Sequence, residues 1–282
     1  MPAVSIGAGT PENHVEPHPN PTPSPRQDNR AHHETVPVTS TTIPVLLVIG
    51  FATFVRSALG FGEALIGVPL LALFVPLRVA VPVMVLISIT VSTIVLVEDW
   101  RHVHRRSAGS LLLATMIGTP AGLLLLTRVD ASIVKAGLGV VIASFASASL
   151  GYRRGAVLTD DRFAWPFGLS AGVLGGAYGM NGPPVVMYGA LRGWSPQRFR
   201  ATLQGYFLPA SIASMLGYWL TGLWTGTVTR VYLTALPASL LAILLGRAVH
   251  GRMNAQGFRR AVDLGLLAIA TLLLAQSVRP FL

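Results

Sequence analysis

Long apolar runs constrain this chain more than any other feature of its sequence. A helix needs about 17 to 25 apolar residues to cross a bilayer. Runs of this length occupy residues 79–97, 110–127, 132–150, 201–220, 228–246 and 260–276. Composition agrees, because 52% of the 282 residues are hydrophobic and only 11% are charged. The sequence therefore predicts an all-α, polytopic, multi-pass protein of the cell membrane.

The first 42 residues differ from the rest of the chain. They hold eight of the 20 prolines and four of the seven histidines, with little apolar content. This composition is typical of a disordered tail. The histidines, His14, His18, His32 and His33, are irregularly spaced. We therefore interpret residues 1–42 as a solvated tail and not as a metal site.

Several classes of function are disfavoured. The chain has no cysteine, which excludes disulfides and cysteine-ligated metals. Its net charge of +10 comes mostly from arginines in short loops between apolar runs, where positive charge orients a membrane protein, so we expect no nucleic-acid partner. The sequence contains no HExxH, GxSxG or P-loop pattern. We therefore expect neither an enzyme nor a cofactor or metal.

Two further apolar regions are interrupted near the middle. Residues 43–77 contain GFGEALIGVP at 60–69, and residues 164–191 contain GMNGPPVVM at 179–187. Glycine permits a tight turn, and proline lets a new helix begin without stranding a donor. Each region is therefore predicted to form a helical hairpin of two shorter limbs, which is either re-entrant or barely spans the membrane. Irregular backbone at membrane depth is tolerated only inside protein or along a cavity.

The order of one hairpin and three helices occurs twice. The sequence divides into a first transmembrane repeat at 43–150, a cytoplasmic linker at 151–163 and a second repeat at 164–282. Gly60 aligns with Gly179. A hairpin returns the chain to its starting side, whereas three helices cross an odd number of times. The second repeat should then enter from the opposite side, which predicts an inverted repeat.

Loop charges predict the orientation. Parity places four arginine-rich loops on one side, and the positive-inside rule makes that side cytoplasmic, with both termini outside. These loops carry Arg101, Arg105, Arg106, Arg153, Arg154, Arg162, Arg192, Arg198, Arg200, Arg247, Arg252, Arg259 and Arg260. The opposite side carries only Arg78, Arg128, Lys135, Arg230 and Arg279 near its span ends.

Broken helices in corresponding positions of the two halves indicate one central substrate site. They expose N–H groups and positive dipole ends, both of which favour anions. The candidate substrate-binding residues are Arg56, Gly60, Gly62, Glu63, Gly179, Asn181, Gly182, Pro183, Thr202 and Gln204. Close packing of helices through small residues is the alternative explanation of the glycines.

Arg56 and Glu63 are costly in a membrane unless they are paired or hydrated. One interpretation makes Arg56 an anion-attracting residue and Glu63 a proton-coupling carboxylate. The other makes them a structural ion pair, or places them close enough to the surface to snorkel. Gly182 aligns with Glu63 in the second repeat, so a proton role would be asymmetric. We expect Glu63 and Asn181 to lie at opposite halves of one midplane site.

Two stretches carry a resemblance to a known family. GFGEALIGVPLLALFVP and AGVLGGAYGMNGPPVVMYGALRGWSPQRFRAT, together with the repeated hairpin and helices, resemble the sulfite exporter TauE/SafE family, also called the four-toluene-sulfonate uptake permease group. The resemblance covers residues 45–277. Where the family commonly has further glycines after GFG, this chain has Glu63.

The resemblance implies a secondary transporter for small anions such as sulfite, thiosulfate, sulfonates or related carboxylates. It also implies coupling to an ion gradient, with a proton or another cation as the partner of the anion. The alternative is an anion channel with a static, glycine-lined filter. The sequence sets neither the substrate, nor the direction of flux, nor the oligomeric state.

Overall fold

The computed structural model of the chain describes residues 42–99, 105–151, 158, 160–249 and 255–278. These residues belong to one compact unit, Pro37–Leu282. The predicted tail, including its four histidines, lies outside the described residues except for Thr42, which begins the first helix. Every regular element among the described residues is helical, which confirms the all-α class.

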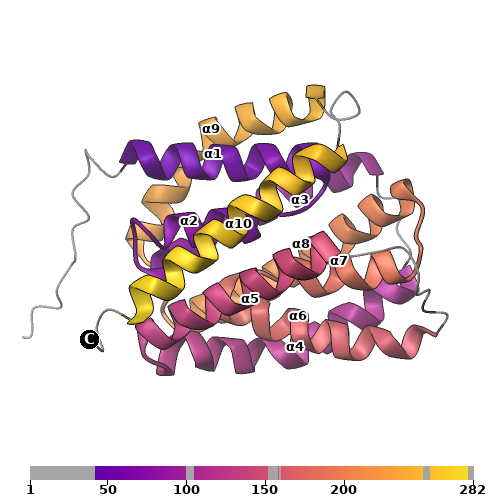
Figure 1. Cartoon of the computed structure of the whole chain (residues 1–282), viewed down its shortest axis with the longest axis horizontal. Helices are drawn as coiled ribbons and strands as arrows, with labels where there is room; N and C mark the ends of the chain where they lie inside the picture. The colour runs from indigo at the N-terminus through magenta and orange to yellow at the C-terminus, as the bar shows by residue number, and fades with distance from the viewer. Residues whose placement is uncertain (1–41, 100–104, 152–157, 159, 250–254, 279–282) are drawn as a thin grey trace, which may run out of the picture. The chain divides into compact units, whose positions relative to one another are not determined.

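The elements follow one another along the chain as Figure 1 shows. They are α1 (Thr42–Leu59), α2 (Glu63–Leu71), α3 (Leu77–Asp99), α4 (Arg105–Arg128), α5 (Ala131–Gly151), η2 (Asp161–Phe163), α6 (Ala164–Tyr178), α7 (Gly182–Leu191), α8 (Pro196–Leu220), α9 (Gly226–Val249) and α10 (Ala255–Val278). The breaks at residues 60–62 and 179–181 fall where the two glycine-rich motifs predict them.

The two hairpins have limbs of different lengths. The second hairpin has short limbs, α6 with 15 residues and α7 with 10, as predicted. In the first hairpin α2 has only nine residues, but α1 has 18 and is long and apolar enough to cross a membrane by itself. At 18 residues α1 is near the lower limit of length for a membrane helix, as expected of a limb that barely spans.

The six predicted spans are all helices. Within the described residues, five helices are long and apolar enough to cross a membrane, namely α1, α3, α4, α5 and α9. The predicted span at 201–220 lies in α8, which has 25 residues but carries polar side chains such as Gln204 toward the protein interior. The predicted span at 260–276 lies in α10, where the apolar stretch is Val262–Ala275. The chain is thus a multi-pass membrane protein.

Helix pairing relates the two halves of the chain. The principal contacts are α1 with α9, α4 with α6, α3 with α8, and α5 with α10. When α1–α5 are matched in order with α6–α10, the pair α1 with α9 corresponds to the pair α6 with α4. The pair α3 with α8 and the pair α5 with α10 each correspond to themselves. The contacts of α3 with α9 and of α4 with α8 exchange in the same way. This pairing is what a two-fold arrangement requires, and the inverted orientation of the repeats stays a prediction.

Glycines allow the first limb of the second hairpin to approach α4 closely. Small residues at this spacing bring helix backbones together in membranes, where apolar side chains gain little by leaving lipid. A Cβ atom on Gly172 would lie 2.3 Å from the Thr115 carbonyl oxygen, and one on Gly122 would lie 2.1 Å from that of Val173. On the equivalent pair, α1 with α9, a Cβ on Gly246 would lie 2.7 Å from the Phe54 carbonyl oxygen.

Side chains from several elements meet where the second hairpin begins and ends. Arg192 forms an ion pair of 3.0 Å with Asp161, which also accepts hydrogen bonds of 3.3 Å from Ser107 and from Tyr188. The start of α4, the start of α6 and the end of α7 therefore lie at the same end of the helix bundle.

At the other end, Arg78 donates to the Thr127 carbonyl, joining the start of α3 to the end of α4. In Figure 1 the start of α1 and the end of α10 lie at the same end, the left.

Residues at the two opposite ends of the helices allow the predicted orientation in the membrane to be tested. The chain is naturally free of cysteine, and both Arg162 and Ala131 have exposed side chains at opposite ends of the helices. We expect Arg162→Cys to resist an impermeant thiol reagent in intact cells and to react after permeabilisation, because positive loops are retained in the cytoplasm. Ala131→Cys should react in intact cells. The reverse labelling pattern would overturn the predicted orientation.

Candidate functional site

Glycine creates both helix breaks. Gly60, Gly62 and Gly179 have φ angles of 88°, 101° and 64°, values that strain any residue with a side chain. Nothing lies within 4 Å of a Cβ built on Gly62, so its glycine serves the turn and not close packing. A Cβ on Gly179 would lie 2.9 Å from Val85, so there both the turn and the packing require glycine.

The two breaks line one pocket. It has a volume of about 30 Å³, on the order of one or two water molecules. Its walls are formed by Arg56, Phe61, Gly62, Glu63, Ala64, Leu65, Ser88, Phe145, Gly179, Met180, Asn181, Gly182, Pro183 and Phe207. Because Glu63 is the first residue of α2 and Gly182 the first of α7, both new helices begin at this pocket. The structure thus brings Glu63 and Asn181 together from the two halves.

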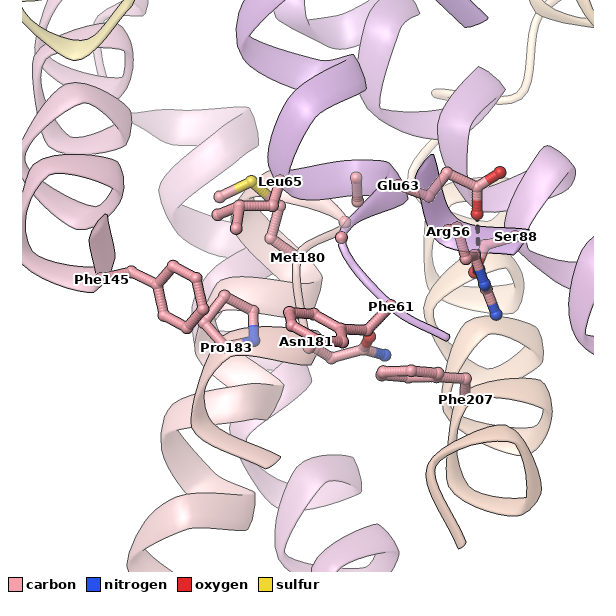
Figure 2. A pocket seen from close by; sticks show the side chains of 14 residues that line it. Arg56, Phe61, Glu63, Leu65, Ser88, Phe145, Met180, Asn181, Pro183 and Phe207 are labelled. Carbon is pink, nitrogen blue, oxygen red and sulfur yellow. Dashed lines mark hydrogen bonds and ion pairs between the residues drawn. The ribbon is translucent and has the colours of Figure 1, made fainter. Parts of the chain in front are cut away.

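A buried ion pair occupies one side of the pocket (Figure 2). Nη1 of Arg56 donates to Oε2 of Glu63 over 2.5 Å, and their side chains are 4% and 1% exposed. Thr53 donates a second hydrogen bond to the carboxylate, of 3.2 Å. Of the interpretations that the sequence left open, the structure has the ion pair, and the burial excludes snorkelling. Proton coupling by Glu63 stays a prediction.

The guanidinium of Arg56 also contacts two helices outside the first hairpin, α3 and α8. Nη1 donates to Ser88 over 2.6 Å, and Nη2 donates to Ser92 over 2.5 Å and to Gln204 over 3.0 Å. The Phe207 ring lies 5.2 Å from the guanidinium carbon, within range of a cation–π interaction. Nε is buried without a hydrogen-bond partner among the described residues. One cation therefore ties α1 to α2, α3 and α8.

Gln204 connects the second half of the chain to the first break. Its side-chain amide donates to the Gly60 carbonyl over 2.9 Å, while its oxygen accepts from Arg56. The Gly60 carbonyl follows the last residue of α1, where a helix leaves carbonyls without internal partners. Gln204 satisfies this group from α8, so the geometry of the first break depends on a residue 144 positions away in sequence.

Asn181 presents an unused amide to the pocket. It is the N-cap residue of α7, yet its side chain makes no capping hydrogen bond. The residue is 7% exposed, and Figure 2 shows its amide directed toward Phe207 on the side of Arg56. Among the described residues, none forms a hydrogen bond with this amide. An unused donor and acceptor at a pocket wall is suited to a bound polar group.

Most predicted site residues line the pocket, and three do not. Arg56, Gly62, Glu63, Gly179, Asn181, Gly182 and Pro183 are in its walls. Gly60 and Gln204 lie behind them, joined by their hydrogen bond, and Thr202 is fully buried outside the lining. Whether any of these residues binds a substrate stays a prediction.

Sequence reasoning missed part of the site. Ser211 of α8 donates a hydrogen bond of 3.3 Å to Ser88 of α3, so polar positions in the corresponding helices of the two halves meet beside the pocket. Ser92 has a sequence signal as well, since it follows Ser88 by one helical turn and so lies on the same face. The contributions of Phe145 and Phe207 have no such signal, because aromatic residues in apolar helices are ordinary there.

The described residues include no group of three or more His, Asp or Glu side chains placed to hold a metal ion. The charged groups of the site are instead one arginine and one glutamate, which line a small pocket between two helix N-termini. Such an arrangement is suited to holding a small charged molecule and offers no nucleophile paired with a base.

A model of the sulfite exporter TauE/SafE family matches residues 45–273. The chain belongs to this family. The match runs from α1 to α10 and confirms the resemblance of the sequence motifs. Membership implies anion-exporter-type transport across a membrane and a small anionic substrate. No match was found among curated proteins or among solved structures.

The ion pair leads to a test of stability. Arg56→Met leaves Glu63 buried without its cation, which typically costs about 3–5 kcal/mol, whereas replacing both members of a buried pair by apolar residues is often nearly neutral. We therefore expect a markedly lower melting temperature for Arg56→Met in detergent, and a substantial recovery in Arg56→Met/Glu63→Leu.

Arg230→Met provides the control, because Arg230 is exposed near a span end. Its melting temperature should match that of the wild type. An Arg56→Met protein as stable as the wild type would show that the pair does not hold the first hairpin.

Proposed function

We propose that this protein is a secondary transporter that carries a small anion across the membrane, with the substrate bound between the two helix breaks. The observation that carries the proposal is the meeting of both breaks at one pocket that also contains Arg56. Two helix N-termini and one guanidinium supply positive potential at this pocket. The Asn181 amide adds a neutral hydrogen-bonding group.

Glu63 competes with the anion for Arg56. While the carboxylate is ionised, the pair is neutral overall, and a second anion in the pocket would face the negative charge of Glu63 directly. Protonation of Glu63 leaves the guanidinium charge uncompensated, and an incoming anion can then replace the carboxylate as its partner. The anion and the proton would bind together, since each favours the other. This linkage is the basis of a proton-coupled carrier.

Alternating access would use the two halves as moving parts. The contact of α1 with α9 corresponds to the contact of α6 with α4, which supports two repeats related by two-fold symmetry. We propose that these repeats have inverted orientations. In that arrangement one hairpin opens toward each side of the membrane. The pocket holds only about 30 Å³, so a substrate larger than one or two water molecules requires the breaks to move apart.

An anion channel is the alternative function. A channel would need the glycine breaks to form a static filter, open at both ends during conduction. Two features favour a carrier: the small volume of the pocket, and the hydrogen-bonded network of Arg56, Glu63 and Gln204 that joins α1, α2 and α8 beside it. A carrier saturates and exchanges one anion for another, whereas conduction through a channel does not require exchange.

Flux measurements separate the two functions. In proteoliposomes containing the purified protein, we expect uptake of sulfite or methanesulfonate to saturate and to be accelerated by unlabelled anion on the opposite side. Acceleration of this kind requires a site that faces one side at a time. Large single-channel currents in planar bilayers, without exchange, would establish a channel instead.

The role of Glu63 is tested by Glu63→Gln. Glutamine resembles the protonated acid, so we expect anion exchange to persist while accumulation driven by a proton gradient is lost. In the wild type, anion affinity should rise as pH falls and Glu63 becomes protonated, by a factor in the range of about 5 to 150 that is common for linked ligands. In Glu63→Gln the affinity should be high at every pH.

Asn181→Ala provides the comparison for Glu63→Gln. This variant removes a neutral amide, so it should weaken anion binding equally at all pH values. If Glu63→Gln keeps the pH dependence of the wild type, Glu63 is a structural partner of Arg56 and the coupling proposal fails, while anion transport through the same pocket can still be measured.

A further inference from the structure

The pocket has two walls of different chemistry. The polar wall carries Arg56, Glu63 and Ser88, with the Phe207 ring beside the guanidinium. The apolar wall carries Leu65, Phe145, Met180 and Pro183. Figure 2 shows the ion pair and Phe145 on opposite sides, with Asn181 and Phe61 between them. A molecule that fills this pocket therefore meets charge and hydrogen bonds at one end and carbon at the other.

The polar wall favours a single negative charge. Arg56 is the only cationic side chain in the lining, and Glu63 lies beside it as a competing anion. When Glu63 is protonated, the wall offers one unit of positive charge, supplemented by the partial charges of two helix N-termini. A second negative charge on the substrate would be buried without a partner, which is costly in a low-dielectric site.

The apolar side chains offer no group to satisfy an oxygen atom. Phe145, Leu65 and Met180 are all buried, at 8%, 5% and 1% exposed, and all three line the pocket. An oxyanion oxygen placed against it would lose its hydrogen bonds to water without gaining a donor, at a cost of about 1–3 kcal/mol. A methyl or ethyl group in that position would instead gain from leaving water.

Phe145 reaches the pocket from a helix that is not part of either hairpin. It lies on α5, whose principal contact is with α10, whereas the other residues of the apolar wall belong to the second limbs or the breaks. Its ring is therefore carried by a separate part of the fold. A larger or smaller side chain at this position changes the depth of the apolar end while leaving the polar wall in place.

We propose that Phe145 determines substrate specificity, by limiting the pocket to monoanions that carry a short apolar substituent. The sulfonate or carboxylate head binds at Arg56 and Asn181, and the substituent rests against Phe145. This inference rests on the proposed function, because it assigns the substrate class of the same site. It excludes divalent inorganic oxyanions as the preferred substrates.

The experiment compares the inhibition of methanesulfonate uptake in proteoliposomes by a set of anions. Sulfate and sulfite represent inorganic oxyanions, ethanesulfonate and propionate represent short substituents, and butane-1-sulfonate represents a longer one. The wild type should be inhibited best by the short organic anions. In Phe145→Ala the preference for butane-1-sulfonate over methanesulfonate should rise by about tenfold, as is common for added methylenes in an apolar pocket.

Two further variants make the comparison specific. Phe145→Leu retains an apolar side chain of intermediate size, so it should fold if Phe145→Ala does not and should shift the preference in the same direction by a smaller factor. Phe51→Ala removes the same ring from α1, where Phe51 is 49% exposed outside the pocket. It should leave the order of inhibitors unchanged.

The outcomes separate the inference from the function on which it rests. If the wild type transports anions but prefers sulfate or sulfite, or if both Phe145 variants keep the wild-type order, the specificity inference is overturned and anion transport stands. If no anion on the panel is transported by well-folded protein, both proposals fail. A shift toward longer substituents in the Phe145 variants alone supports the inference.

Discussion

The core of a bilayer contains no water to hydrogen-bond a peptide group that leaves a helix, so every break in a membrane helix must be enclosed by protein or line a cavity. This chain has two such breaks, at residues 60–62 and 179–181, and the structure places both at one pocket. The arrangement of the other helices follows from this need, since α3 and α8 pack together beside the breaks and supply the groups that surround them. The same exposed N–H groups that make a break costly in lipid make it useful to an anion.

Charge makes the two breaks unequal. In the first half, Arg56 and Glu63 form a buried pair whose remaining hydrogen bonds reach α3 and α8. In the second half, the residues that align with them are Gly175 and Gly182, and the polar group at the pocket is the neutral amide of Asn181. A two-fold arrangement of helices thus contains a one-sided charge, which confines any titration in the pocket to Glu63. In the proposed proton-coupled carrier, this asymmetry would let one half respond to protons while the other contributes a fixed surface.

Much of this could be predicted from local sequence. The apolar runs fix the helices, and GFG and GMNGPP fix the positions of the breaks, because glycine and proline act on the backbone where they stand. The start of α1 could be predicted as well, because the polar tail gives way to an apolar run within one residue of Thr42. The pairing of Arg56 with Glu63 was one of two open interpretations, since a spacing of seven residues across a break says nothing about which way the side chains turn.

The sequence by itself determined that the chain is an all-helical, multi-pass membrane protein with two glycine-broken hairpins, and its motifs identified the TauE/SafE family. Only the tertiary structure decided that Gln204 donates to the Gly60 carbonyl, that Ser92 accepts from the Arg56 guanidinium, and that Phe145 lines the pocket. The physical reason is the range of the interactions. Hydropathy and backbone preference act within a few residues, whereas these contacts join helices up to 144 positions apart and depend on how the helices pack.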